Sequence, residues 1–116
     1  MTNQENLNIP HWQSLDTHPD LSEKLKIAMR NVVDPELGMN IIQLGLVRDL
    51  IIEEDHAILK MILTTPFCPY GPSMIEDTRV KAEAALGMPT HIDLAMDPWD
   101  FSMMEEGLSN DWGIFG

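Results

Sequence analysis

The chain has 116 residues, of which 44% are hydrophobic and 22% are charged. This length and composition are typical of one globular domain and exclude a wholly disordered chain and a fibrous repeat. Seven Lys and Arg residues against 19 Asp and Glu residues give a formal net charge of −12, so partners with negatively charged surfaces, such as nucleic acids and anionic membranes, are disfavoured.

Residues 1–19 are polar and contain Pro10 and Pro19 as breakers. We expect them to form an irregular N-terminal arm with Trp12 as its large anchor. A helix is predicted over residues 21–33, because apolar residues recur there at helical spacing. Asp20 is its expected N-cap and Glu23 completes a capping box. Pro35 should end this helix, because it disfavours the helical conformation of the preceding residue.

Two strands are predicted over residues 46–52 and 57–64, joined by the acidic turn 53–56. Both strands carry apolar residues on both faces, so we expect a sheet that is well covered. A second helix should begin at Pro69 or Pro72 and end at Leu86, with Gly87 as its stop. The alternation of Ile92, Leu94 and Met96 predicts a third strand.

The second helix links two strands, so a right-handed crossover and a parallel strand pair are expected. The predicted fold is a compact α+β domain of order α-β-β-α-β, with helices packed on a small mixed sheet. We place this domain at residues 20–100 and an acidic, aromatic tail at 101–116. The tail either folds back over the domain or presents aromatic anchors to a partner or a second subunit.

Several familiar chemistries are excluded by their missing motifs. The chain has no G-x-S-x-G elbow, no phosphate-binding G-x-x-x-x-G-K-[ST] loop, no G-x-G-x-x-G fingerprint and no H-E-x-x-H helix. Its four histidines are scattered, with no spacing that suggests a shared metal. Standard hydrolases, kinases and zinc proteases are therefore set aside.

The single cysteine, Cys68, follows Thr64-Thr65-Pro66-Phe67 where the second strand gives way to the second helix. A helix N-terminus stabilises a thiolate, so this thiol should have a lowered pKa and could attack electrophiles or bind metal. Thr64 and Thr65 could orient whatever binds the sulfur. A buried, inert cysteine that acts as a small hydrophobic residue is the alternative.

The sequence Asp34-Pro35-Glu36-Leu37-Gly38 is the second candidate. Its plain interpretation is a helix stop and a turn with a solvated Glu36. If the fold returns this turn to the end of the second strand, its carboxylates would lie beside Cys68, able to accept a proton or to ligate a metal.

Three motifs in order, 34–38, 44–49 and 64–69, with Asp97-Pro98-Trp99 after them, resemble the small metal-sulfur cluster assembly factor family. That family includes bacterial SufT-type proteins, a component of the eukaryotic cytosolic iron-sulfur targeting machinery, and an accessory protein of phenylacetate-degrading oxygenases. The resemblance covers residues 20–100. The oxygenase accessory has extra C-terminal cysteines that are absent here, so the general assembly branch is favoured.

The resemblance implies an accessory factor, not an enzyme, in iron-sulfur cluster assembly or transfer. It also implies a set of functional residues: Asp34, Glu36, Leu37, Thr64, Thr65 and Cys68. A cluster usually needs four protein ligands, most often cysteines, and this chain has one. We therefore expect no tightly bound cofactor and only a transient iron or iron-sulfur cluster at Cys68.

The expected partners are iron-sulfur scaffold or carrier proteins and apo-target proteins, with a homodimer left open. A cytoplasmic location is expected, because no secretory signal or apolar run of about 20 residues is present and one cysteine cannot form an internal disulfide. Two alternatives stay open. Cys68 could serve a thiol-dependent enzyme with Asp34 or Glu36 as base, or the chain could be a pure interaction module.

Overall fold

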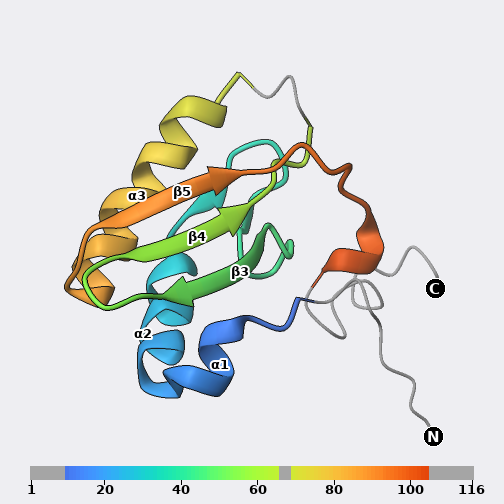
Figure 1. The fold of residues 1–116 in the computed structure, drawn as a ribbon. Helices are drawn as coiled ribbons and strands as arrows, with labels where there is room; N and C mark the ends of the chain where they lie inside the picture. Colours follow the sequence, from blue (N-terminus) through green and yellow to red (C-terminus); the bar gives the residue numbers. More distant parts are fainter. Residues whose placement is uncertain (1–9, 66–68, 105–116) are drawn as a thin grey trace, which may run out of the picture.

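The computed structural model describes residues 10–65 and 69–104. In chain order the elements are α1 (Gln13–Thr17), α2 (Pro19–Met29), β1 (Val33–Asp34), β2 (Met39–Asn40), β3 (Val47–Ile52), β4 (Ala57–Met61), α3 (Gly71–Leu86), β5 (Thr90–Leu94) and the 3-10 helix η1 (Phe101–Met103). The predicted α+β class and the order of its main elements are confirmed (Figure 1).

The main sheet is mixed, with strand order β3-β4-β5. The central strand β4 pairs antiparallel with β3 and parallel with β5. Since α3 connects β4 to β5, the predicted parallel crossover is confirmed. Gly87 ends α3 in the left-handed conformation, with φ +71°, as expected for a glycine stop. Both long helices, α2 and α3, lie behind the sheet in Figure 1 and contact each other.

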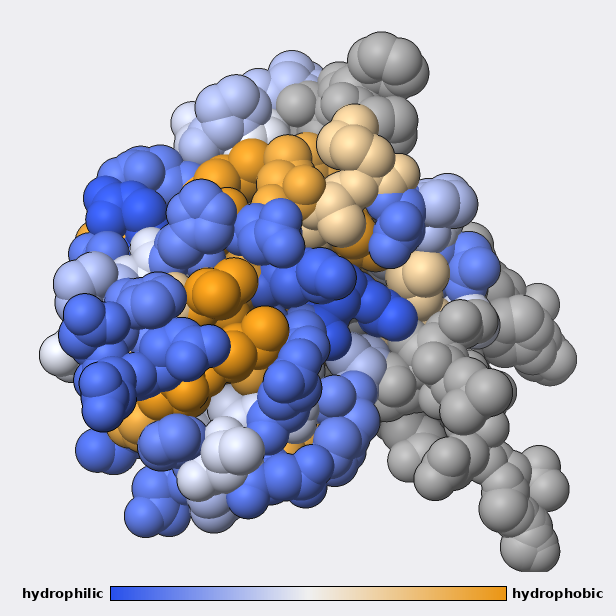
Figure 2. All heavy atoms as spheres, in the orientation of Figure 1, coloured by the Kyte–Doolittle hydropathy of each residue, from blue (hydrophilic) through white to orange (hydrophobic). Residues whose placement is uncertain are grey.

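One face of the sheet forms the core together with the helices. Leu50, Leu59 and Met61 on this face are fully buried. The expectation of a sheet covered on both faces is wrong, because Lys60, His91 and Asp93 on the opposite face are exposed. Figure 2 views this open face, where hydrophilic side chains surround smaller hydrophobic areas. The half-buried isoleucines Ile51 and Ile58 account for the apolar residues that suggested a second covered face.

The boundaries of α2 differ from the predicted helix at both ends. The helix begins at Pro19 with His18 as its N-cap, and no side chain caps it. The expected capping box of Asp20 and Glu23 is therefore wrong, because proline suits the first helical position and places the start two residues earlier. The helix ends at Met29, since the β-branched Val32 and Val33 favour extended structure.

Part of the arm is helical, contrary to the predicted irregular chain. Residues 13–17 form α1, and Trp12 before it is only 4% exposed. Its indole Nε1 donates a hydrogen bond to the carbonyl oxygen of Val47 at 3.1 Å, so the predicted anchor role of Trp12 is confirmed. Within the described residues, no helix has the length and apolar character needed to cross a membrane.

Candidate functional site

The first candidate motif forms a small hairpin between β1 and β2, which the sequence analysis did not predict. Val33 pairs with Asn40 and Asp34 with Met39. The turn is closed by Gly38, whose N–H donates to the carbonyl oxygen of Asp34 at 2.8 Å and whose φ is +71°. Glycine tolerates this left-handed conformation without steric cost, so the motif's glycine makes the turn and leaves Asp34 at its base.

Asp34 is a buried carboxylate, with 0% of its surface exposed. Its Oδ1 accepts a hydrogen bond from the backbone N–H of Glu36 at 2.8 Å. Its Oδ2 accepts one from the hydroxyl of Thr64 at 3.1 Å. Both oxygens are thus partnered, which is what a buried charged group requires. The contact with Thr64 confirms that the fold returns this turn to the chain after β4.

The remaining predicted site residues have different surroundings. Glu36 is exposed and Leu37 is 38% exposed, so both face solvent at the turn. Thr65 is half-buried beside Thr64. Cys68 lies outside the described residues, together with Pro66 and Phe67. The structure therefore brings together Asp34 and Thr64.

A cavity of about 210 Å³ lies next to this contact, at the carboxyl ends of the parallel strands β4 and β5. Its lining residues are Leu63, Thr64, Thr65, Ala95, Met96, Asp97, Pro98 and Trp99. Ligands commonly bind beyond the carboxyl ends of parallel strands. The contributions of Ala95 and Met96 were missed by the sequence analysis, because a short apolar run after a strand carries no chemical signature.

The Asp97-Pro98-Trp99 motif is fixed against the loop before β3. The indole Nε1 of Trp99 donates to the carbonyl oxygen of Leu44 at 2.7 Å. Arg48 donates to the carbonyl oxygen of Gly45 at 2.9 Å. Burial lowers the pKa of the Arg48 guanidinium, and the nearby carboxylates Asp97 and Asp100 act in the opposite direction. The motif at residues 44–49 and the motif at residues 97–99 therefore contact each other in the fold.

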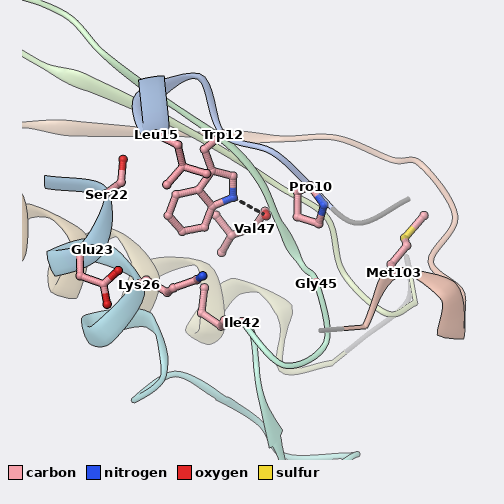
Figure 3. A pocket seen from close by; sticks show the side chains of 10 residues that line it. All are labelled: Pro10, Trp12, Leu15, Ser22, Glu23, Lys26, Ile42, Gly45, Val47 and Met103. Carbon is pink, nitrogen blue, oxygen red and sulfur yellow. Dashed lines mark hydrogen bonds between the residues drawn. The ribbon is translucent and has the colours of Figure 1, made fainter. Parts of the chain in front are cut away.

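Among residues 10–65 and 69–104, no three His, Asp or Glu side chains gather in a group that could hold a metal ion. A second cavity, of about 90 Å³, lies among Pro10, Trp12, Leu15, Ser22, Glu23, Lys26, Ile42, Gly45, Val47 and Met103 (Figure 3). None of the predicted site residues lines it. The cavity beside Thr64, by contrast, is lined by the predicted site residues Thr64 and Thr65.

The chain is similar to a known protein family and to several of its members. The model of the iron-sulfur cluster assembly protein family matches residues 22–93. A relative from Porphyromonas gingivalis, an Fe-S protein maturation auxiliary factor, is 37% identical over 79% of this chain and 87% of its own. The corresponding Staphylococcus aureus factor, SufT, is 36% identical over 63% of this chain and 86% of its own.

Solved structures agree with this result. The DUF59 domain from Bacillus anthracis is similar with a TM-score of 0.72 and 25% identity, over 85% of this chain and 97% of that one. A conserved hypothetical protein from Thermotoga maritima has a TM-score of 0.67 and 30% identity, over 79% and 93% of the two chains. Because the family model spans most of the described fold, including Asp34 and Thr64, the chain belongs to the iron-sulfur cluster assembly protein family.

Proposed function

We propose that this protein is an auxiliary factor in the maturation of iron-sulfur proteins, and that it acts through Cys68. In this role it would pass iron, or a cluster, between scaffold or carrier proteins and apo-target proteins. The relatives from Porphyromonas gingivalis and Staphylococcus aureus are named as maturation auxiliary factors and not as enzymes. We therefore favour a transfer factor over a thiol-dependent enzyme.

The hydrogen bond between Asp34 and Thr64 is the observation that carries this proposal. Cys68 follows Thr64 by four positions, so their Cα atoms lie within about 15 Å, because consecutive Cα atoms are about 3.8 Å apart. This reach would allow the thiol to act together with the carboxylates of the acidic hairpin. A soft thiolate beside hard carboxylate oxygens is a donor set that iron accepts.

The number of thiolate ligands in this chain supports a transient interaction with iron or a cluster. Iron-sulfur clusters are usually held by four cysteine thiolates, whereas this chain supplies one. An incoming cluster would keep some ligands from its donor or gain them from its target. The iron or cluster is thus cargo, and Cys68 with the exposed Glu36 would form a half-site that another protein completes.

The proposal is tested by Cys68→Ser in cells that lack the wild-type protein. Activities of several unrelated iron-sulfur enzymes should fall together, relative to the amount of each enzyme. Ser73→Ala, on the exposed first turn of α3, is the control and should retain wild-type activity. Loss confined to one pathway would favour a dedicated enzyme or an oxygenase accessory. Full activity of Cys68→Ser would favour a pure interaction module and contradict the proposal.

A second test uses the purified chain. The rate of iodoacetamide alkylation should give a titration midpoint below about 8.5, the pKa of an ordinary cysteine. Anaerobic incubation with iron and sulfide, followed by visible absorption and metal analysis, should load less than one cluster per chain, and Cys68→Ser should abolish that loading. A slow thiol with no pH-dependent rise would contradict the proposed chemistry.

A further inference from the structure

The two edges of the main sheet differ in how they are covered. At the β3 edge, the indole of Trp12 donates to the carbonyl oxygen of Val47, and the backbone N–H of Gln13 donates to Asp49 at 2.8 Å. Trp12 and the start of α1 thus cover that edge. The other edge is β5, whose only neighbour among the described strands of the sheet is β4. In Figure 1, α3 lies behind β5, and no strand of the described residues is drawn next to β5 on the side away from β4.

The hydrogen-bond pattern shows which groups of β5 point outward. Ala57 donates to the carbonyl oxygen of Pro89, and Ala95 donates to that of Met61, at 2.8 and 2.9 Å. Odd-numbered positions from 89 to 95 therefore pair with β4, since backbone groups of successive strand residues point to alternate sides. The backbone N–H of Thr90 points the other way and reaches Glu83 at 3.0 Å. Ile92 and Leu94 accordingly direct their N–H and C=O groups away from the sheet.

These outward groups have no hydrogen-bond partner among the described residues. Apolar side chains accompany them, because Leu94 is 37% exposed and Met96 is 68% exposed. Natural edge strands are commonly protected by lysine or by a bulge. Residues 90–96 contain no lysine, and the register between β4 and β5 runs without a shift. The edge is therefore well suited to receive another strand.

The edge also leads directly into the candidate site. Ala95, Met96 and Asp97 continue β5 and line the 210 Å³ cavity, together with Thr64 and Thr65. A strand paired with Ile92 and Leu94 would therefore extend to the mouth of that cavity. Its residues beyond the pairing would lie beside the threonines and the acidic hairpin.

We infer that β5 binds an extended segment of an apo-target protein by strand addition. In this segment, apolar side chains alternate with neutral or basic ones. This inference rests on the proposed function and names how a client is recognised. The charge of the partner follows from the chain's own, since its net charge is −12. At the edge, the carboxylates of Glu83, Asp93 and Asp97 outnumber the two cations, Lys60 opposite Asp93 in β4 and Arg79 paired with Glu83. Main-chain hydrogen bonds would supply affinity that is independent of most side chains.

A second copy of the chain is a weaker occupant. Two chains of net charge −12 repel each other. In the antiparallel register that pairs Ile92 of one copy with Leu94 of the other, Asp93 would stand opposite itself, and like charges directly opposite destabilise a strand pair. The acidic edge therefore favours a different, more basic polypeptide.

The test uses the full chain, labelled with nitrogen-15, and a short synthetic peptide that alternates valine with lysine. Amide signals of Ile92, Leu94 and Met96 should shift on titration, and the N–H groups of Ile92 and Leu94 should gain protection from exchange. N-methylation of the alternate peptide bonds that face β5 should weaken binding about tenfold or more, because each methyl removes a hydrogen bond. N-methylation of the other alternate set should have little effect.

Variants of the protein sharpen the result. Leu94→Pro removes an outward N–H that is absent from the β4 ladder, and edge strands tolerate proline, so binding should fall about tenfold or more. Leu94→Ala keeps the N–H and is the matched control: it removes the same side chain, so its binding should exceed that of Leu94→Pro by about tenfold or more. A peptide with glutamate in place of lysine should bind about tenfold more weakly, and added salt should reduce that difference.

Several outcomes would overturn the inference. These are no binding of the lysine peptide, equal binding of the two N-methylated peptides, shifts confined to the cavity beside Trp12, or a dimer whose Ile92 and Leu94 amides are already protected. Cys68→Ser should bind the peptide as wild type does. If peptide binding fails while Cys68→Ser still lowers iron-sulfur enzyme activities, the docking inference is wrong and the proposed function stands. If the peptide binds as expected while Cys68→Ser leaves iron-sulfur enzyme activities unchanged, the proposed function is wrong and the peptide-binding edge stands.

Discussion

The hydroxyl of Thr64 donates a hydrogen bond to the buried carboxylate of Asp34, across 30 positions of sequence. This contact joins the β1–β2 hairpin to the segment that follows β4. Since Asp34 is fully buried, breaking this hydrogen bond should lower the stability of the fold. The same bond also holds the acidic hairpin near the segment that carries the proposed chemistry. Experiments on this pair must therefore separate stability from function.

Thr64→Val should lower the free energy of unfolding by about 1–3 kcal/mol, because it leaves Oδ2 of Asp34 buried without its donor. Urea unfolding measures this loss. Thr64→Ser keeps the hydroxyl and should retain most of the stability. A double-mutant cycle with Asp34→Asn should show a coupling well above the measurement error. Additive effects of the two changes would mean that the bond contributes nothing in solution.

Glu36→Gln should separate function from folding. The side chain is exposed at the hairpin turn, so the free energy of unfolding should change by less than about 0.5 kcal/mol. If Glu36 contributes an oxygen to transient iron, activities of iron-sulfur enzymes in cells should nevertheless fall. Glu54→Gln removes the same charge from the exposed turn between β3 and β4 and is the control. Equal activities for the two variants would exclude a role for the Glu36 carboxylate.

Gly45→Ala should be much more damaging than Gly38→Ala, although both glycines have positive φ, +74° and +71°. Alanine in the left-handed region costs about 1–2 kcal/mol at either position. At Gly45 a Cβ would also collide with the backbone carbonyl of Met103, whereas at Gly38 it would meet open space. Figure 3 shows Gly45 and Met103 beside the same cavity.

Thermal and urea unfolding of the two alanine variants provide the comparison. Gly45→Ala should lose about 1–3 kcal/mol more than Gly38→Ala, the usual cost of overpacking. Similar losses would show that the segment around Met103 moves away from Gly45 without cost. In that case η1 would not be a fixed part of the fold in solution.

Trp12→Phe should destabilise the protein by about 1–3 kcal/mol, although the ring stays apolar and large. The change removes the indole donor and leaves the carbonyl oxygen of Val47 buried without that partner. His11→Ala, at the exposed neighbouring position, should have an effect within about 0.5 kcal/mol. Equal stabilities of the two variants would show that the arm is not anchored at β3.

Glu83 should give stability a specific pH dependence. The backbone N–H of Thr90, and then the side chain of Arg79, lower the pKa of the Glu83 carboxyl. A carboxyl whose pKa is lowered by folding stabilises the protein fully above its unfolded pKa of about 4.3, and this contribution is lost as the pH falls through the lower folded value. Glu83→Gln should thus reduce stability at pH 7 and have no such effect in strong acid.

Urea midpoints of wild type and Glu83→Gln, measured between neutral pH and strong acid, test this dependence. Glu54→Gln changes the net charge by the same amount and is the matched control. The difference in urea midpoint between Glu54→Gln and wild type should not shrink in this way as the pH falls below the unfolded pKa of Glu83. A constant difference for Glu83→Gln across the range would mean that the ionised carboxylate does not support β5.

Local patterns in the sequence were sufficient to predict those helices and strands for which periodicity, turn residues and breakers all indicate the same structure. In β3, β4 and α3, apolar periodicity and chain breakers all point to the same structure, and Gly87 ends α3 as predicted. The start of α2 was predicted at Leu21, with Asp20 as its N-cap, because a capping box is a local pattern. The folded chain begins α2 at Pro19 instead, since proline at the first turn competes with that box.

The short elements and the site depended on contacts between distant residues. The pairs Val33–Asn40 and Asp34–Met39 are too short to produce a strand pattern. The start of α1 is fixed by hydrogen bonds from Trp12 and Gln13 to β3, which no local pattern specifies. The motifs identified Asp34 and Thr64 as residues of interest, but nothing in their spacing specified that they touch. Burial decided it: a carboxylate taken out of water needs a donor for each oxygen, and the packing of the hairpin against the end of β4 provides Thr64.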